Sequence, residues 1–143
     1  MAIKQKKVEF LEQMIDRKHD YPDERDRLLI KQLEVKILNT FNMFRIPFVI
    51  GSFGVCLLVL FRSKQPLHVR LLPLVFLGSF SSIYNYHIGQ YGVYRNLDGI
   101  YGFLTHRQDT QVGREARAFL ADLQADLDAV ADHRRELRRL RIE

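Results

Sequence analysis

Two long apolar segments, separated by a short basic stretch, constrain this chain more than any other feature. The first, Ile46–Phe61, has sixteen residues and no charge, and the second, Leu71–Tyr94, has twenty-four residues in which His87 is the one titratable side chain apart from tyrosine. A bilayer core about 30 Å thick needs roughly 20 mostly apolar residues of helix. The first segment reaches that length when Phe41–Phe44 is added and Arg45 lies at the interface with its head group turned outward. We therefore predict two transmembrane helices.

The nine residues between the segments are too few to cross the membrane again, so the two helices should form a hairpin. The predicted fold class is an all-α integral membrane protein: a two-helix transmembrane hairpin with an amphipathic N-terminal helix and a long C-terminal amphipathic helix. The expected elements are an amphipathic helix over 1–19, a helix over 22–61 that contains the first span (42–61), a basic loop over 62–70, the second span over 71–94, a Gly/Tyr-rich linker over 95–112 and a coiled-coil-like helix over 113–143.

The excess of basic over acidic residues lies next to the apolar segments. Residues 1–45 carry ten Lys/Arg and eight Asp/Glu, residues 46–94 carry three bases and no acid, and residues 95–143 carry nine of each. A nucleic-acid-binding domain instead clusters its bases on one folded face. We therefore expect no nucleic-acid partner. The single Cys56 lies inside the first apolar segment, where it is interpreted as a small apolar residue that fills space.

Each flanking segment carries an apolar stripe that something must cover. At the N-terminus, Ile3, Phe10 and Met14 fall at helical spacing, which predicts a contact with a partner helix or with the chain's own next helix. In the last thirty residues, apolar side chains recur in steps of three and four from Ala116 to Leu137, as in a coiled-coil seam. This seam should be covered by another chain or by the N-terminal helix.

Basic residues in the loop and near the C-terminus are candidates for contact with a partner or with lipid headgroups. The cations of the last two turns are typical of a solvated helix end, and equally of docking on an acidic partner or on anionic headgroups. The candidates are Arg62, Lys64, Arg70, Arg134, Arg135, Arg138 and Arg139.

Small residues recur in both apolar segments. Gly51 and Gly54 lie one turn apart in the first, and Gly78, Ser81 and Ser82 do the same in the second. In an antiparallel hairpin these two groups fall at matching depth, and membrane helices approach one another closely at small residues. The pattern predicts a helix-packing face, against the alternative that glycine is common in membrane helices generally.

Tyrosines and glycines gather where the second segment ends. Tyr84, Tyr86, Tyr91 and Tyr94 are typical of an aromatic belt at the membrane interface. The interleaved glycines of GQYG and GIYG indicate either a close approach of the backbone or a bend. His87 is interpreted as a hydrogen-bonded interfacial histidine, because haem ligation would need a second histidine at the same depth.

No motif for catalysis stands out in the chain. The sequence contains no HExxH, no CxxC and no Ser/His/Asp order that predicts a catalytic site. We therefore expect a protein that is not an enzyme, with no metal and no cofactor apart from structural lipids such as cardiolipin.

The second apolar segment carries the motifs of a resemblance. It reads LLPLVFLGSFSSIYNYHIGQYGVY, follows a short basic stretch with a proline and precedes a charged helix. Together with the Lys/Arg-rich helix that enters the first segment, it resembles the plasminogen receptor (KT) family, small two-span membrane proteins widespread in eukaryotes. The match is best over Leu72–Gly92, through the Leu-Pro-Leu core, the Tyr84-x-Tyr86 pair and the Gly-x-Tyr-Gly that follows. It extends loosely over Glu24–Thr105.

The resemblance implies the hairpin architecture and an association with mitochondrial as well as surface membranes. The named activity of the family depends on a C-terminal lysine that captures plasminogen kringles. This chain ends in Arg141, Ile142 and Glu143 and has no lysine after Lys64. The resemblance therefore implies the hairpin architecture, whereas plasminogen binding through such a lysine is not expected.

Two classes of function remain. The first is a non-catalytic structural, accessory subunit of a multi-subunit membrane complex, with the mitochondrial inner membrane (respiratory chain or ATP synthase) favoured and with other subunits and membrane lipids as partners. The alternative is a plasma-membrane receptor or adaptor of the plasminogen-receptor type. No Asn-x-Ser/Thr sequence is present, which favours a membrane outside the secretory route. The count of bases leans toward both termini on the cytoplasmic or matrix side.

Overall fold

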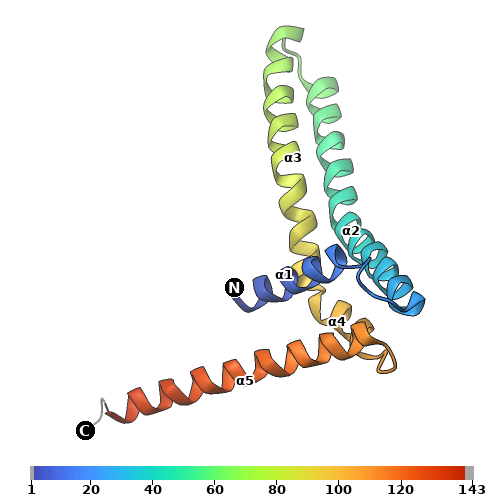
Figure 1. The fold of residues 1–143 in the computed structure, drawn as a ribbon. Helices are drawn as coiled ribbons and strands as arrows, with labels where there is room; N and C mark the ends of the chain where they lie inside the picture. The colour runs from blue at the N-terminus through green and yellow to red at the C-terminus, as the bar shows by residue number, and fades with distance from the viewer. Residues whose placement is uncertain (1, 141–143) are drawn as a thin grey trace. The chain divides into compact units, whose positions relative to one another are not determined.

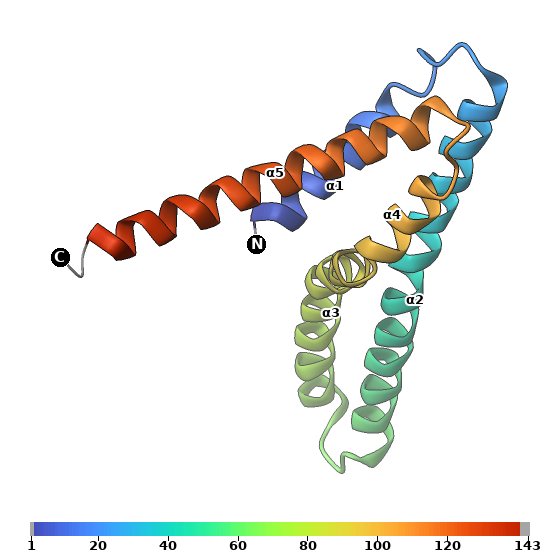
Figure 2. The same cartoon turned by 90° about the horizontal axis from the view of Figure 1, so that it is seen from below.

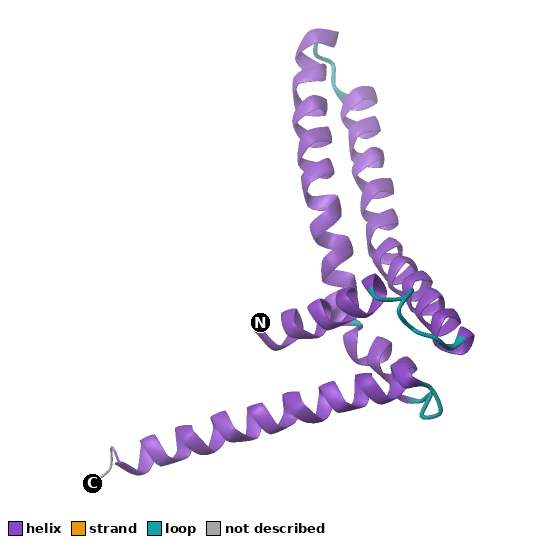
Figure 3. Ribbon diagram, in the orientation of Figure 1, coloured by secondary structure: helices purple, strands orange, loops and turns teal. Residues whose placement is uncertain are grey.

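The structure is a computed structural model that describes residues 2–140, and it is helical throughout. Helices make up 88% of the described residues, and no strand occurs among them (Figure 3). The chain folds into two compact units, residues 34–98 and the described part of residues 1–33 with 99–143. In chain order the helices are α1 (Ala2–Asp16), α2 (Glu24–Arg62), α3 (Leu67–Arg95), α4 (Leu97–Thr105) and α5 (Gln111–Leu140) (Figure 1).

The first unit, built from 1–33 and 99–143, has a closed apolar core. The α1 helix lies along α5 (Figure 2), and the ring of Phe10 stacks on that of Phe119 with centroids 4.2 Å apart. The first half of the C-terminal seam is therefore covered by the N-terminal helix, one of the two alternatives given for the seam, whereas the N-terminal stripe meets α5 rather than the chain's own next helix. The buried apolar side chains of this unit are Leu11, Met14, Tyr21, Leu29, Ile30, Leu33, Ile100, Tyr101, Leu104, Val112, Ala116 and Leu123.

The start of α5 is held by groups from two other parts of the first unit. The backbone N–H of Val112 donates to Asp26 Oδ1 of α2 at 3.2 Å, and that of Gly113 donates to Thr110 Oγ1 at 3.1 Å. These bonds satisfy N–H groups that have no partner within their own helix. A Cβ atom at Gly113 would overlap the Arg107 carbonyl oxygen, so the tight entry into α5 requires glycine here.

Two tyrosines join segments that are distant in the sequence. Tyr21 Oη donates to Glu115 Oε2 at 2.6 Å, and Tyr101 Oη donates to the Lys7 carbonyl oxygen at 2.8 Å. Burial raises the pKa of both phenols above the ordinary value, and for Tyr21 the hydrogen bond to Glu115 raises the pKa further. Both hydroxyls therefore keep their protons, and their hydrogen bonds, well above neutral pH.

The α4 helix corrects the predicted linker over residues 95–112. The glycines of GIYG indicated either a close approach of the backbone or a bend, yet a helix runs through them from Leu97 to Thr105, and an added Cβ at Gly99 or Gly102 would meet nothing within 4 Å. Its apolar residues Ile100, Tyr101 and Leu104 fall on one face and are buried in the core of the first unit. Packing of an amphipathic face outweighs the roughly 1 kcal/mol by which each glycine disfavours a helix.

The second unit, residues 34–98, is formed largely by the paired helices α2 and α3. Their chains run side by side in opposite directions in both Figure 1 and Figure 2. Only residues 63–66 join them, so the predicted loop over 62–70 is too long. The apolar run begins at Leu71, but α3 begins at Leu67, because a helix continues through charged residues as readily as through apolar ones. The α2 helix passes through Pro47 without interruption.

Candidate functional site

The apolar surface of the second unit is the largest unusual feature of the described chain. Both α2 and α3 are long and apolar enough to cross a membrane, and no residue of the most apolar stretch of either helix is buried. Of the 27 large apolar side chains that are exposed in the described residues, 22 belong to this unit. Continuous exposed apolar surface of this extent marks a site of association with lipid or with other proteins.

The close contact between α2 and α3 is not at the glycines that the sequence singled out. At Gly51, Gly54 and Gly78 an added Cβ would find nothing within 4 Å. At Gly89 it would overlap the ring of Phe41, and at Gly92 the ring of Phe44. The predicted packing face is thus corrected: the helices approach where phenylalanine rings of α2 lie on glycines of α3.

The two serines of the predicted packing face do not link the helices either. Ser82 Oγ donates to the Gly78 carbonyl oxygen one turn earlier in α3, and no bond from Ser81 to α2 occurs in the described chain. A serine that bonds back to its own helix satisfies its hydroxyl locally. Gly89 and Gly92 belong to the GQYG sequence, so close approach, rather than a bend, explains these glycines.

The tyrosines of the predicted aromatic belt lie at the same end of α3. Tyr84, Tyr86 and Tyr91 are exposed, and Tyr94 is half-buried. The Tyr86 ring lies 5.9 Å from that of Phe41, and its hydroxyl accepts a hydrogen bond from Gln90 Nε2 at 3.0 Å. These positions suit an amphipathic belt, which stays a prediction.

Two further polar residues of α3 belong to this region. His87 is exposed and lies edge-on to the rings of Tyr84 and Tyr86, at 6.4 and 6.1 Å. Asn85 Oδ1 is buried, and no hydrogen-bond partner for it occurs in the described residues.

The three basic residues in and beside the short connection between α2 and α3 divide into two kinds. Arg70 donates to the carbonyl oxygens of Leu60, at 3.1 Å, and of Gln65, and so caps the end of α2. Arg62 and Lys64 are exposed. Of the three candidates for headgroup contact, Arg70 therefore already has partners inside the chain, while Arg62 and Lys64 face outward.

The distal part of α5 carries the other predicted cations and lines a shallow groove. Val130 and Leu137 are 51% and 53% exposed, whereas Ala116 and Leu123, earlier in the same seam, are buried. The groove has a volume of about 480 Å³. Its apolar wall consists of Ile3, Leu127, Val130 and Ala131, and its basic wall of Arg134, Arg135 and Arg138. We call it the Arg134 groove. Arg139 is exposed and does not line it.

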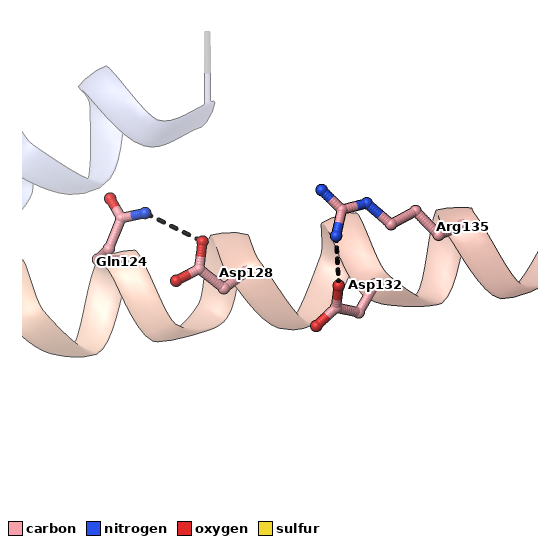
Figure 4. A network of polar contacts seen from close by, with 4 residues as sticks. All are labelled: Gln124, Asp128, Asp132 and Arg135. Atoms are coloured by element: carbon pink, nitrogen blue, oxygen red, sulfur yellow. Dashed lines mark hydrogen bonds and ion pairs between the residues drawn. The ribbon is translucent and has the colours of Figure 1, made fainter.

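In the distal part of α5 two polar contacts are local. Gln124 Nε2 donates to Asp128 Oδ1 at 3.1 Å, and Arg135 Nη1 pairs with Asp132 Oδ1 at 3.2 Å (Figure 4). A third joins two helices, because Lys6 Nζ of α1 lies 3.8 Å from Asp126 Oδ2. Arg135 therefore has a local counter-ion.

Sequence reasoning missed three residues that shape these sites. Asp26 was not among the candidates, because nothing local to it indicates that it caps α5. For Gly92, the GQYG sequence indicated a possible close approach of the backbone, but nothing in the sequence indicated that Phe44 is the residue it meets. Ile3 was assigned to a covered stripe, and it lines the Arg134 groove because α1 begins beside that part of α5.

No family model, no curated protein and no solved structure matches the chain. No group of three or more His, Cys, Asp or Glu residues suited to hold a metal ion occurs within residues 2–140.

Proposed function

We propose that the chain is a non-catalytic accessory subunit of a multi-subunit membrane complex. In this proposal α2 and α3 span the bilayer as a hairpin, and the first unit is the water-exposed part that contacts neighbouring subunits. The observation that carries it is the reversal of burial: the first unit encloses its apolar residues, and the second unit turns them outward.

Physical chemistry supports a membrane around the second unit. Each Å² of apolar surface left in water forgoes about 25 cal/mol of stabilisation. A helix in the core of a soluble protein buries its most apolar stretch, and neither α2 nor α3 does so. Lipid removes this cost, and it also explains why the two helices need only a few close contacts with each other.

The mitochondrial inner membrane is the favoured location on grounds of sequence. Residues 62–70, between the two apolar segments, carry three basic residues and no acid, and no acceptor sequence for N-glycosylation occurs in the chain. The chain also resembles a family found in mitochondrial as well as surface membranes. The complexes proposed are those of the respiratory chain or the ATP synthase. The second candidate is a plasma-membrane receptor or adaptor of the plasminogen-receptor type, which the same resemblance favours.

Two measurements test the proposal. Alkaline extraction of native membranes should leave the chain in the pellet, since a spanning hairpin resists it, and release into the supernatant contradicts membrane anchoring. Native gel electrophoresis in mild detergent with mass spectrometry of the band should then show migration with subunits of one large complex. Migration as a small species, together with labelling by an impermeant reagent on intact cells, contradicts the subunit proposal and supports the receptor.

A further inference from the structure

The Arg134 groove lies where α5 extends beyond α1, the helix that covers its first half. In Figures 1 and 2 the distal part of α5 continues past the beginning of α1. The first half of the α5 seam is covered, because Phe10 stacks on Phe119. Past Ile3, the residue of α1 that lines the groove, the seam has no cover within the described chain, and every side chain from Asp128 to Leu140 is exposed.

The charge of the groove is positive. None of its lining residues is acidic. Arg134 and Arg138 lie one turn apart and have no ion pair within the described residues, whereas Arg135 pairs with Asp132. Asp132 and Glu136 each lie two residues from Arg134, about half a turn around the helix, and so on another face. The groove therefore combines an apolar wall with two guanidinium groups that have no ion pair in the described part of the chain.

We propose that the Arg134 groove binds the headgroup of an anionic phospholipid. Guanidinium groups bind phosphate oxygens through paired charge-assisted hydrogen bonds, which Arg134 and Arg138 are spaced to supply. The wall of Ile3, Leu127 and Val130 contacts the first carbons of the acyl chains. An apolar helix face bordered by arginines is a recurring surface for anionic membranes. The inference rests on the proposed membrane anchoring, which places such lipids within reach of the chain.

A protein helix fits the groove less well. Arg134 occupies the seam position between Val130 and Leu137. A helix packed on this seam would have to remove the Arg134 guanidinium from water, which costs several kcal/mol unless an acid meets it in good geometry. A second copy of this chain would bring two arginine-lined surfaces together. A phospholipid avoids both costs, because its charge lies at the wet edge and its apolar part lies over the apolar wall.

Native mass spectrometry of the full chain in a neutral detergent tests the proposal. Phosphatidylglycerol is the anionic probe, and phosphatidylcholine is the neutral one. The groove variant is Arg134→Gln with Arg138→Gln. Its matched control is Arg25→Gln with Arg114→Gln, which removes the same charge from exposed positions of the first unit outside the groove. Circular dichroism checks that both variants keep their helix content.

The wild type and the control should retain phosphatidylglycerol in preference to phosphatidylcholine. The groove variant should bind it more weakly by about fivefold for each arginine, or about 1 kcal/mol per basic residue at an anionic surface. Equal retention by the groove variant, an equal loss in the control, or equal retention of phosphatidylcholine would overturn the proposal. A photo-crosslinker placed at Val130 gives a further test in native membranes. If it captured an acidic protein segment, and the wild type retained phosphatidylglycerol no better than phosphatidylcholine, the proposal would also be overturned.

Failure of this inference is separable from failure of membrane anchoring. Lipid retention is measured in detergent and does not require the chain to span a bilayer. Alkaline extraction is measured on native membranes and does not depend on Arg134 or Arg138. A chain that resists extraction but binds no anionic lipid contradicts only the groove proposal.

Discussion

The two units use the same kinds of side chain in opposite ways. Ile30, in the first unit, is 0% exposed, and Ile50, in the second, is 66% exposed, although both lie on α2. The first unit gains stability from a core of its own. The second unit exposes most of its apolar surface, so its stability depends on what surrounds it. Apolar composition alone therefore does not show how a segment of this chain is stabilised.

Hydrogen bonding separates the units in the same way. In the first unit, the bonds from Tyr21, from Tyr101 and to Asp26 join residues about 90 positions apart. In the second unit, the side-chain bonds described reach at most ten positions, from Arg70 to Leu60. Helices that satisfy their polar groups locally suit an environment without water. Long-range bonds suit a unit that must specify its packing in water.

The largest expected effect comes from the same truncation in the two environments. Ile30→Ala opens a cavity in the first unit and should cost about 2–5 kcal/mol of stability, as is usual for a buried isoleucine. Ile50→Ala, its control, should change the stability by less than about 0.5 kcal/mol, because the side chain is exposed. Hydrogen exchange of the α4 and α5 peptides in the solubilised full chain measures the stability of the first unit in each variant. Similar protection in the two variants would show that the first unit has no independent core.

A charge placed on each surface tests whether the second unit faces lipid. Ile50→Lys should disfavour membrane insertion by about 3 kcal/mol, the cost of a lysine at the centre of a spanning helix. Leu28→Lys makes the matched change at a 51% exposed position of the first unit and should leave insertion unchanged. The fraction resistant to alkaline extraction is the measurement. If Ile50→Lys integrates as fully as the wild type, the outward apolar face of α2 does not lie in lipid.

Glycine substitutions sharpen the comparison inside the second unit. Gly92→Val should separate α2 from α3 at Phe44 and cost about 1–3 kcal/mol, since overpacking forces neighbouring groups to move. Gly54→Val is the control, because nothing lies within 4 Å of that site. The yield of a disulfide crosslink between cysteines introduced in α2 and α3 reports their pairing. Loss of pairing at Gly54 and not at Gly92 would restore the packing face predicted from sequence.

The smallest effect is a dependence on alkaline pH confined to the first unit. A phenol in the unfolded chain has a pKa of about 10. Folding raises the pKa of Tyr21 above this value. At a pH below the pKa of the unfolded phenol, the Tyr21 hydroxyl therefore makes its full contribution to stability. As the pH rises further, the unfolded state loses its proton first and the contribution is lost.

The Tyr21→Phe variant isolates this effect. It should be about 1 kcal/mol less stable near neutral pH, because one hydrogen bond is missing, and should lose less stability in alkali. Denaturation followed by exchange of α5 peptides at about pH 8 and about pH 11 measures the difference. If Tyr21→Phe lost as much stability between these two pH values as the wild type, the pH dependence would come from other groups.

Much of the helical framework follows from local patterns in the chain. The apolar run that starts at Ile46 and the three-and-four spacing around Leu123 predicted α2 and α5 within a few residues. The linker prediction failed at α4 because the glycines were weighed and the burial of Leu104 was not visible. Of the Arg134 groove, the arginines were candidates from sequence. Ile3 was not, because its place beside α5 depends on a contact between the two ends of the chain.

The sequence by itself determined the all-helical class, the two apolar segments and the basic end of α5, because each depends on residues within a few turns of one another. Tertiary structure alone decided that Asp26 caps α5, that Phe44 lies on Gly92, and that the seam is covered in its first half and open in its second. Those features depend on which surfaces meet after folding. A side chain is buried only when two surfaces meet, and a local stretch of sequence specifies only one of the two.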